Sequence, residues 1–170
     1  KLGPANLNAL GAYGNYLVRA KRMDEGAVFL RKALEVSPAD PRANYLMATV
    51  YSEEGDEVRA VEHLKRAIES APGCIPALNN LAWLMATSTN SGGRDPVRAL
   101  QLVDPLLASG GGGDASVLAT VAAAHAENGR FAQAVEFGGK AVAAARARGD
   151  EELAGTFEKR VRGYEQNLER

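Results

Sequence analysis

The sequence predicts an all-α fold, a right-handed α-α solenoid of four helix pairs closed by a C-terminal capping helix. Three observations predict it: an internal repeat of 34 residues, apolar residues at helical spacing within each copy, and turn residues where two helices per copy must begin and end. The chain has 170 residues, is 46% hydrophobic and 24% charged, and has a net charge of −1. These values are typical of a globular protein, and we expect residues 1–170 to form a single domain.

The repeat consists of similar residues separated by 34 positions. Three such pairs are Leu30 and Leu64, Ala33 and Ala67, and Pro38 and Pro72. The fourth copy follows the third at an offset of 40, because extra residues fall mainly in a Gly/Ser/Thr/Asn-rich stretch that is typical of a surface loop. The predicted copies are residues 7–40, 41–74, 75–114 with an inserted loop at 87–95, and 115–148, followed by a capping helix at about 150–168.

The helix ends are predicted by turn chemistry. Asp40 and Asp95 each precede a proline, which is the pattern of an N-cap followed by proline at the first helical position. Gly55, Gly129 and Gly149 stand where helices should end, because glycine adopts the left-handed C-cap conformation without a Cβ penalty. The fourth copy has no closing proline, so its second helix is predicted to be long. The run Gly110–Gly113 is predicted to be a flexible linker, with Asp114 as the next N-cap.

The period and its small residues resemble the tetratricopeptide repeat family, in its bacterial form. The matching positions are Tyr13, Gly14, Leu17, Leu30, Ala33, Pro38, Met47, Ala48, Tyr51, Ala60, Leu64, Ala67, Pro72, Leu81, Ala82, Met85, Ala99, Val103, Val121, Ala122, Ala134 and Ala141. The resemblance implies stacked helix pairs whose first helices line a concave groove that binds a partner peptide. It also implies that Asn80 holds peptide backbone, because members of the family often use an asparagine at that position.

One subset of this family binds a free C-terminal carboxylate with two asparagines and three basic side chains. In this chain Asn15 matches the first asparagine, but Leu46 replaces the second. The basic positions are occupied by Gly11, Pro76 and Asn80. Binding of a chaperone-type C-terminal tail is therefore not expected.

Equivalent positions of the first helices give a predicted peptide-binding groove. Its residues are Asn15, Arg19, Arg42, Tyr45, Thr49, Asn79, Asn80 and Trp83. Amides and guanidinium groups can hydrogen-bond peptide backbone or carboxylates, and Tyr45 and Trp83 are candidate anchors. The corresponding places of the fourth copy hold almost only alanine.

Each group of groove residues has a simpler interpretation. Trp83 is alternatively buried beneath the inserted loop, and Asn79 and Asn80 are alternatively solvated or cap a neighbouring loop. Arg19 and Arg42 alternatively form ion pairs with nearby acids.

Nothing in the sequence predicts an enzyme, a metal site or a cofactor. His63 and His125 have no nearby serine or cysteine in a nucleophile setting, and His125 lies in an apolar stripe that indicates packing. Cys74 is the single cysteine and lies in a predicted turn. The glycine run lacks the Gly-Lys-Ser/Thr of a phosphate loop. Balanced charge gives no field for nucleic acid, and no apolar run is long enough to span a membrane.

The expected partner is therefore a protein or peptide. Two alternatives stay open. The first is a structural or oligomerisation role, in which the exposed end of the first pair, around Leu7–Leu17 and Phe29, docks on another copy of the chain. The second is a regulatory segment of a larger, envelope-associated bacterial protein. No signal peptide or membrane-spanning segment is visible in this fragment, and the sequence predicts no cellular location.

Overall fold

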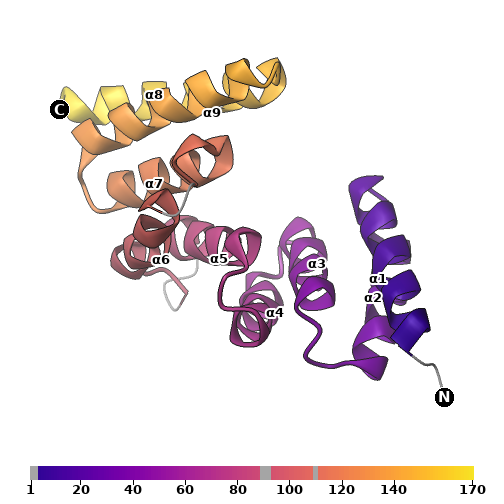
Figure 1. Ribbon diagram of the computed structural model, residues 1–170. Helices are drawn as coiled ribbons and strands as arrows, with labels where there is room; N and C mark the ends of the chain where they lie inside the picture. Colours follow the sequence, from indigo (N-terminus) through magenta and orange to yellow (C-terminus); the bar gives the residue numbers. More distant parts are fainter. Residues whose placement is uncertain (1–3, 89–92, 109–110) are drawn as a thin grey trace. The chain divides into compact units, whose positions relative to one another are not determined.

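The computed structural model describes residues 4–88, 93–108 and 111–170, and these contain nine α-helices, one short 3-10 helix and no strand (Figure 1). In chain order the elements are α1 (Pro4–Arg19), α2 (Met23–Val36), α3 (Pro41–Glu53), α4 (Glu57–Ser70), α5 (Ile75–Thr87), α6 (Pro96–Ala108), η1 (Gly111–Gly113), α7 (Ala115–Glu127), α8 (Phe131–Ala147) and α9 (Glu151–Leu168). The predicted all-α fold class is confirmed, and the helix count fits four pairs and a capping helix.

Aspartate caps begin several helices, as predicted. The Asp40 carboxylate accepts a hydrogen bond from the Ala43 amide at 2.6 Å, with Pro41 at the first helical position. Asp95 accepts from the Arg98 amide at 2.9 Å, ahead of Pro96. Such caps satisfy amides that have no partner inside the helix, so they define where each helix starts.

Three predicted glycines end helices in the left-handed region. The φ angles are +77° at Gly55, +72° at Gly129 and +75° at Gly149. A fourth helix end has the same geometry without glycine, because Lys21 follows α1 with φ at 60°. Lys21 lies 34 residues before Gly55, so it occupies the equivalent repeat position with a side chain that disfavours this conformation.

The second helix of the fourth copy is long, as predicted, with 17 residues in α8 against 14 in α4. The linker prediction is wrong for Gly111–Gly113, which form η1, because the three residues wind into one tight turn before Asp114 caps α7. Of the inserted loop at 87–95, residues 89–92 lie outside the described residues, as do 109–110.

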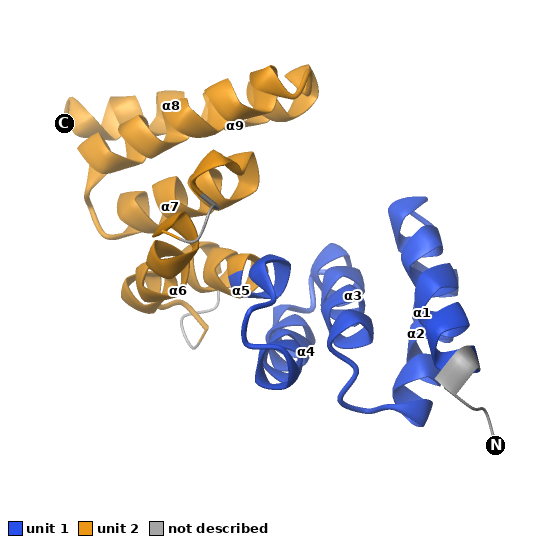
Figure 2. Cartoon of the chain, in the orientation of Figure 1, with its two compact units in different colours: residues 1–78 blue, residues 79–170 orange. Residues whose placement is uncertain are grey.

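The contacts within the chain divide it into two compact units, residues 1–78 and 79–170 (Figure 2). Helix α5 begins in unit 1 and ends in unit 2. The assignment of the whole chain to one domain of four repeats stays a prediction.

In unit 1 the α1–α2 pair packs against α3. The buried core residues are Val18, Ala27, Leu30, Ala33, Ala43, Leu46, Met47 and Val50. Glycines allow α1 and α2 to approach closely: a Cβ on Gly26 would lie 2.9 Å from Val18 Cγ2 and 3.3 Å from the Gly14 carbonyl oxygen. Gly26 is a weak helix former, and it is required here by packing.

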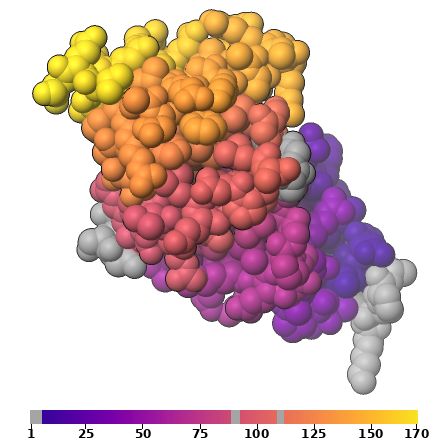
Figure 3. Space-filling model, turned by 60° about the vertical axis from the view of Figure 1, so that its left-hand side comes forward, coloured from indigo at the N-terminus to yellow at the C-terminus, as the bar shows by residue number. Residues whose placement is uncertain are grey.

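In unit 2, α8 packs against both α7 and α9. The atoms of these helices, orange to yellow in the space-filling view, form a closely packed body (Figure 3). The buried core residues are Ala115, Leu118, Ala119, Ala141, Val142, Ala145, Ala154 and Phe157. On the capping helix α9, Phe157 is 6% exposed, whereas Leu168 is 53% exposed.

Candidate functional site

The predicted groove residues divide between the two units, and each set is described within its own unit. Unit 1 holds Asn15 and Arg19 on α1, and Arg42, Tyr45 and Thr49 on α3. Unit 2 holds Asn79, Asn80 and Trp83 on the part of α5 that belongs to it.

On α1, Asn15 and Arg19 line one surface hollow of about 460 Å³ together with Ala12, Tyr16 and Ala20. The five residues share a face because they are spaced three or four residues apart along the helix. Asn15 is half-buried and Arg19 is exposed, and Arg19 has no ion-pair partner among the described residues. The hollow therefore offers an amide, a guanidinium group and an aromatic ring to a ligand.

On α3, Arg42, Tyr45 and Thr49 follow one helix face. Arg42 is exposed and forms no ion pair within the described part of the chain, while Tyr45 and Thr49 are half-buried. The Thr49 hydroxyl donates to the Tyr45 carbonyl oxygen at 3.2 Å. Because this donor is used within the helix, Thr49 can offer a partner only an acceptor.

On α5, Asn79 and Trp83 lie one turn apart and so share a face. Asn79 is 9% exposed, and its Oδ1 is buried without a hydrogen-bond partner in the described structure. A buried, unpaired amide oxygen costs free energy. Because this oxygen is buried, a partner's N–H group could reach it only if the surrounding side chains moved. Asn80, the next residue, is half-buried.

Trp83 is half-buried and its ring is in contact with a residue that sequence reasoning missed. The guanidinium carbon of Arg160, on α9, lies 4.4 Å from the centroid of the Trp83 indole. This is a cation–π contact, which holds the two side chains face to face. No local sequence signal marks Arg160, because the contact joins residues that are far apart in the chain.

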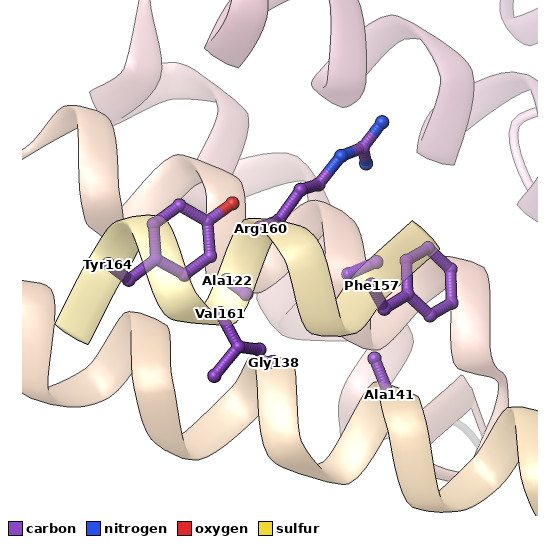
Figure 4. Close-up of a pocket in the computed structure, with 8 residues that line it drawn as sticks. Ala122, Gly138, Ala141, Phe157, Arg160, Val161 and Tyr164 are labelled. Atoms are coloured by element: carbon purple, nitrogen blue, oxygen red, sulfur yellow. The ribbon is translucent and has the colours of Figure 1, made fainter. Parts of the chain in front are cut away.

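A small cavity lies beside this contact, between α7, α8 and α9 (Figure 4). Its lining includes Ala119, Gly138 and Val161, and Figure 4 shows the Arg160 side chain pointing away from it. The volume is about 10 Å³, roughly the space of one water molecule. The cavity is therefore a gap in the packing and is too small for a ligand.

Both histidines are held by their neighbours. Asn44 is fully buried, and its Nδ2 donates to the carbonyl oxygens of Pro38 at 3.0 Å and Asp40 at 2.9 Å. Its Oδ1 must then accept, so the His63 Nδ1–H donates to it across 2.9 Å. His125 stacks on Phe137 with 5.5 Å between ring centroids. Burial lowers the pKa of both imidazoles, so both favour the neutral form.

Within residues 4–88, 93–108 and 111–170, no three or more histidine, cysteine, aspartate or glutamate side chains come together in a way that could hold a metal ion. None of the described helices combines the length and the apolar character that crossing a membrane requires.

Comparison with known proteins finds a repeat family over part of this chain. Residues 17–84 match the family model described as Tetratricopeptide repeat. The family is thus matched over residues 17–84, and the likeness of the chain to solved structures shows that the remainder has the same kind of fold. No curated protein matches the sequence.

Three solved structures illustrate the fold. MamA 41-end from Desulfovibrio magneticus RS-1 is 17% identical, with a TM-score of 0.66 and coverage of 98% of both chains. PilW, a widely conserved type IV pilus biogenesis factor, is 16% identical, with a TM-score of 0.70 and coverage of 99% of this chain and 80% of PilW. A thermophilic TPR protein of Thermus thermophilus, TTC0263, is 16% identical, with a TM-score of 0.66 and coverage of 95% of this chain and 98% of TTC0263.

Proposed function

We propose that this chain is a protein-interaction scaffold, without catalytic activity of its own, that binds a segment of a partner protein along the first helices of its repeats. The observation that carries the proposal is the hollow on α1, where Asn15 and Arg19 lie together with Tyr16. An amide and an unpaired guanidinium group can bind the backbone and carboxylates of an extended segment, and the tyrosine ring can anchor it.

Helix α3 and unit 2 offer further contacts of the same kind. Arg42 is exposed and unpaired within the described residues, and Tyr45 lies one turn further along α3. In unit 2, Trp83 provides a half-buried aromatic surface already in contact with Arg160, and Asn80 beside it is half-buried as well. The tetratricopeptide fold supports the same role, because stacked helix pairs create extended binding surfaces.

The test is affinity capture with quantitative mass spectrometry, comparing the native chain with two site variants. One is Asn15→Ala/Arg19→Ala, and the other is Tyr45→Ala/Trp83→Ala. The control is Lys65→Ala, which changes an exposed residue of the second helix α4. Loss of an anchor residue commonly weakens binding by about 2 kcal/mol or more, so the proteins captured by the native chain should be depleted with both site variants and retained with the control. Recovery of the same proteins by all four chains would contradict the proposal.

One observation favours a second function, self-association. Tyr13 is 45% exposed and Tyr16 is 60% exposed at the end of the first helix pair, and exposed aromatic groups are enriched in interfaces. Light scattering over a range of concentrations tests this alternative, since a monomer at every concentration excludes it.

A further inference from the structure

An aromatic face on the first helix pair is made of Tyr13 and Tyr16, which are exposed in the described structure, and Phe29, which is half-buried. The Tyr13 and Tyr16 rings stack with centroids 6.1 Å apart, and Tyr13 meets Phe29 edge to face at 4.7 Å. Val28, beside Phe29 in the sequence, is 42% exposed. The three rings therefore form one continuous surface.

The repeat shows what covers this face elsewhere in the chain. The equivalents of Tyr13 in the next three first helices are Met47, Leu81 and Val121, which are 1%, 5% and 0% exposed. The equivalents of Tyr16 are Val50, Leu84 and Ala124, which are 0%, 9% and 0% exposed. Around Met47 and Val50 the covering residues come from α1 and α2. A helix is thus the kind of element that fits this surface.

The residue types distinguish the aromatic face from a permanent core. At positions where the other repeats have aliphatic residues, α1 has tyrosines, whose hydroxyl groups need a hydrogen-bond partner when buried. Such amphipathic rings suit a surface that is exposed to solvent in the free protein and buried in a complex. The aromatic face therefore suits a partner that binds and dissociates.

The charged residues near the aromatic face indicate which charge a partner should carry. Helix α1 contains no acidic residue. Residues 4–36 carry five basic and three acidic side chains; Glu25 is paired with Arg22, and Lys21 is paired with Glu53 of α3. The Lys32 Nζ lies 5.6 Å from the centroid of the Phe29 ring and has no ion-pair partner among the described residues. A partner with carboxylates beside its apolar stripe would pair with this ammonium group, and complementary charge also speeds association.

A second copy of the chain fits this face less well. Two copies meeting through the same face would bring the Lys32 side chains of both copies to one interface, and helix α1 has no acidic residue to pair with them. A head-to-tail contact through α9 would bury little, because Leu168 is the large hydrophobic residue that α9 exposes.

From these observations we propose that the aromatic face docks an acidic amphipathic helix of another protein. Its apolar stripe packs on Tyr13, Tyr16 and Phe29, and a carboxylate beside the stripe pairs with Lys32. This surface is distinct from the proposed segment-binding positions on α3 and α5, although Tyr16 borders the hollow on α1.

The test uses a fluorescein-labelled designed peptide of about 18 residues, long enough to form a helix, with leucines at helical spacing and glutamates on both flanks. A second peptide has lysines in place of the glutamates. Fluorescence anisotropy is measured with the native chain and with Tyr13→Ala/Tyr16→Ala, Tyr16→Ala and Lys32→Glu. Matched controls on α4 are Val58→Ala, which truncates a side chain 68% exposed, and Lys65→Glu. Circular dichroism verifies that each variant is folded. If Tyr13→Ala/Tyr16→Ala does not fold, Lys32→Glu still tests the proposal.

The glutamate peptide should bind the native chain at least about tenfold more tightly than the lysine peptide. The tyrosine variants and Lys32→Glu should each weaken it by about tenfold, and higher salt should weaken it as well. The affinity should be unchanged by the control variants Val58→Ala and Lys65→Glu. It should also be unchanged by Arg42→Ala and Trp83→Ala, which separates this surface from the proposed segment-binding site.

Three results would overturn the proposal. They are no binding at about 1 mM peptide, equal binding of both peptides, or a native dimer that Tyr16→Ala dissociates, which would assign the surface to a second copy.

Discussion

Single residues show where this chain follows its repeat and where it departs from it. Gly55, Gly129 and Gly149 adopt the left-handed conformation that ends a helix, and Lys21 adopts it without being glycine. At this helix end the Arg22 amide donates to the Leu17 carbonyl oxygen at 2.9 Å, and the same bond joins Asp56 to Tyr51 at 2.8 Å. The turn thus has the same geometry in the two repeats, and Lys21 adopts a costly conformation to make it.

Replacing Lys21 by glycine should therefore stabilise the protein. A non-glycine residue in this region costs roughly 1–2 kcal/mol, and part of that gain is lost because glycine is more flexible in the unfolded chain. We expect Lys21→Gly to raise the free energy of unfolding by about 1 kcal/mol, measured by chemical denaturation.

The control for this change is Lys21→Ala. It removes the exposed pair with Glu53, whose atoms are 3.4 Å apart, but keeps a Cβ in the left-handed region. Exposed pairs contribute little, so the expected change is within about 0.5 kcal/mol. Equal effects of the two substitutions would show that backbone strain at Lys21 is not the cause.

At the scale of helices, close approach depends on which glycine faces a neighbour. Gly138 and Gly139 are adjacent on α8 and have opposite surroundings. A Cβ on Gly138 would lie 2.6 Å from Val161 Cγ2 of α9, whereas a Cβ on Gly139 meets nothing within 4 Å. Figure 4 shows Val161 directly opposite Gly138. Helices α8 and α9 therefore pack closely at this point because Gly138 has no side chain.

These two glycines give a matched pair of substitutions. Gly139→Ala should stabilise by up to about 1 kcal/mol, the gain in helix propensity. Gly138→Ala has the same propensity gain but must displace a stiff β-branched side chain, and overpacking costs roughly 1–3 kcal/mol. We expect Gly138→Ala to lower the melting temperature and Gly139→Ala to raise it.

Adding Val161→Ala to Gly138→Ala tests the cause of this difference. The second substitution removes the clashing methyl groups, so the double variant should lose less stability than the sum of the two single changes. Additive losses would indicate that the helices do not meet at this point.

For the whole molecule, histidine burial predicts how stability depends on pH. Desolvation, reinforced by Arg66 and Arg59, lowers the pKa of His63, and desolvation with Arg130 lowers that of His125, each from an ordinary value of 6.5. Because the folded pKa values lie below the unfolded one, the unfolded chain takes up protons first as the pH falls. This contribution to stability is complete above pH 6.5 and is lost as the pH falls toward the folded pKa values.

Thermal melts from neutral pH down to about pH 5, still above the ordinary pKa of the carboxylates, should therefore show a falling melting temperature. His125→Phe keeps an aromatic ring beside Phe137 and removes one titrating group, so its melting temperature should depend less on pH than that of the native chain. A native profile that is flat between neutral pH and this limit would contradict the assignment.

Much of the fold was predictable because its causes are local. The residues that cap helices, from Asp40 to Gly149, act on backbone groups a few positions away, and the 34-residue period makes neighbouring helices equivalent. The candidate site was less predictable. Sequence position placed Asn15 and Arg19 on one face of α1, but the Trp83–Arg160 contact and the role of Asn44 depend on residues brought together from different helices.

Helices, their ends and their repeat follow directly from the order of residues, because hydrogen bonds and side-chain spacing within a helix are set over a few positions. Which of the equivalent positions are covered follows instead from the packing of whole helices. Tyr13 and Met47 occupy the same place in their repeats, yet one is 45% exposed and the other 1%. Burial depends on whether another helix packs on that place, and no residue specifies this alone.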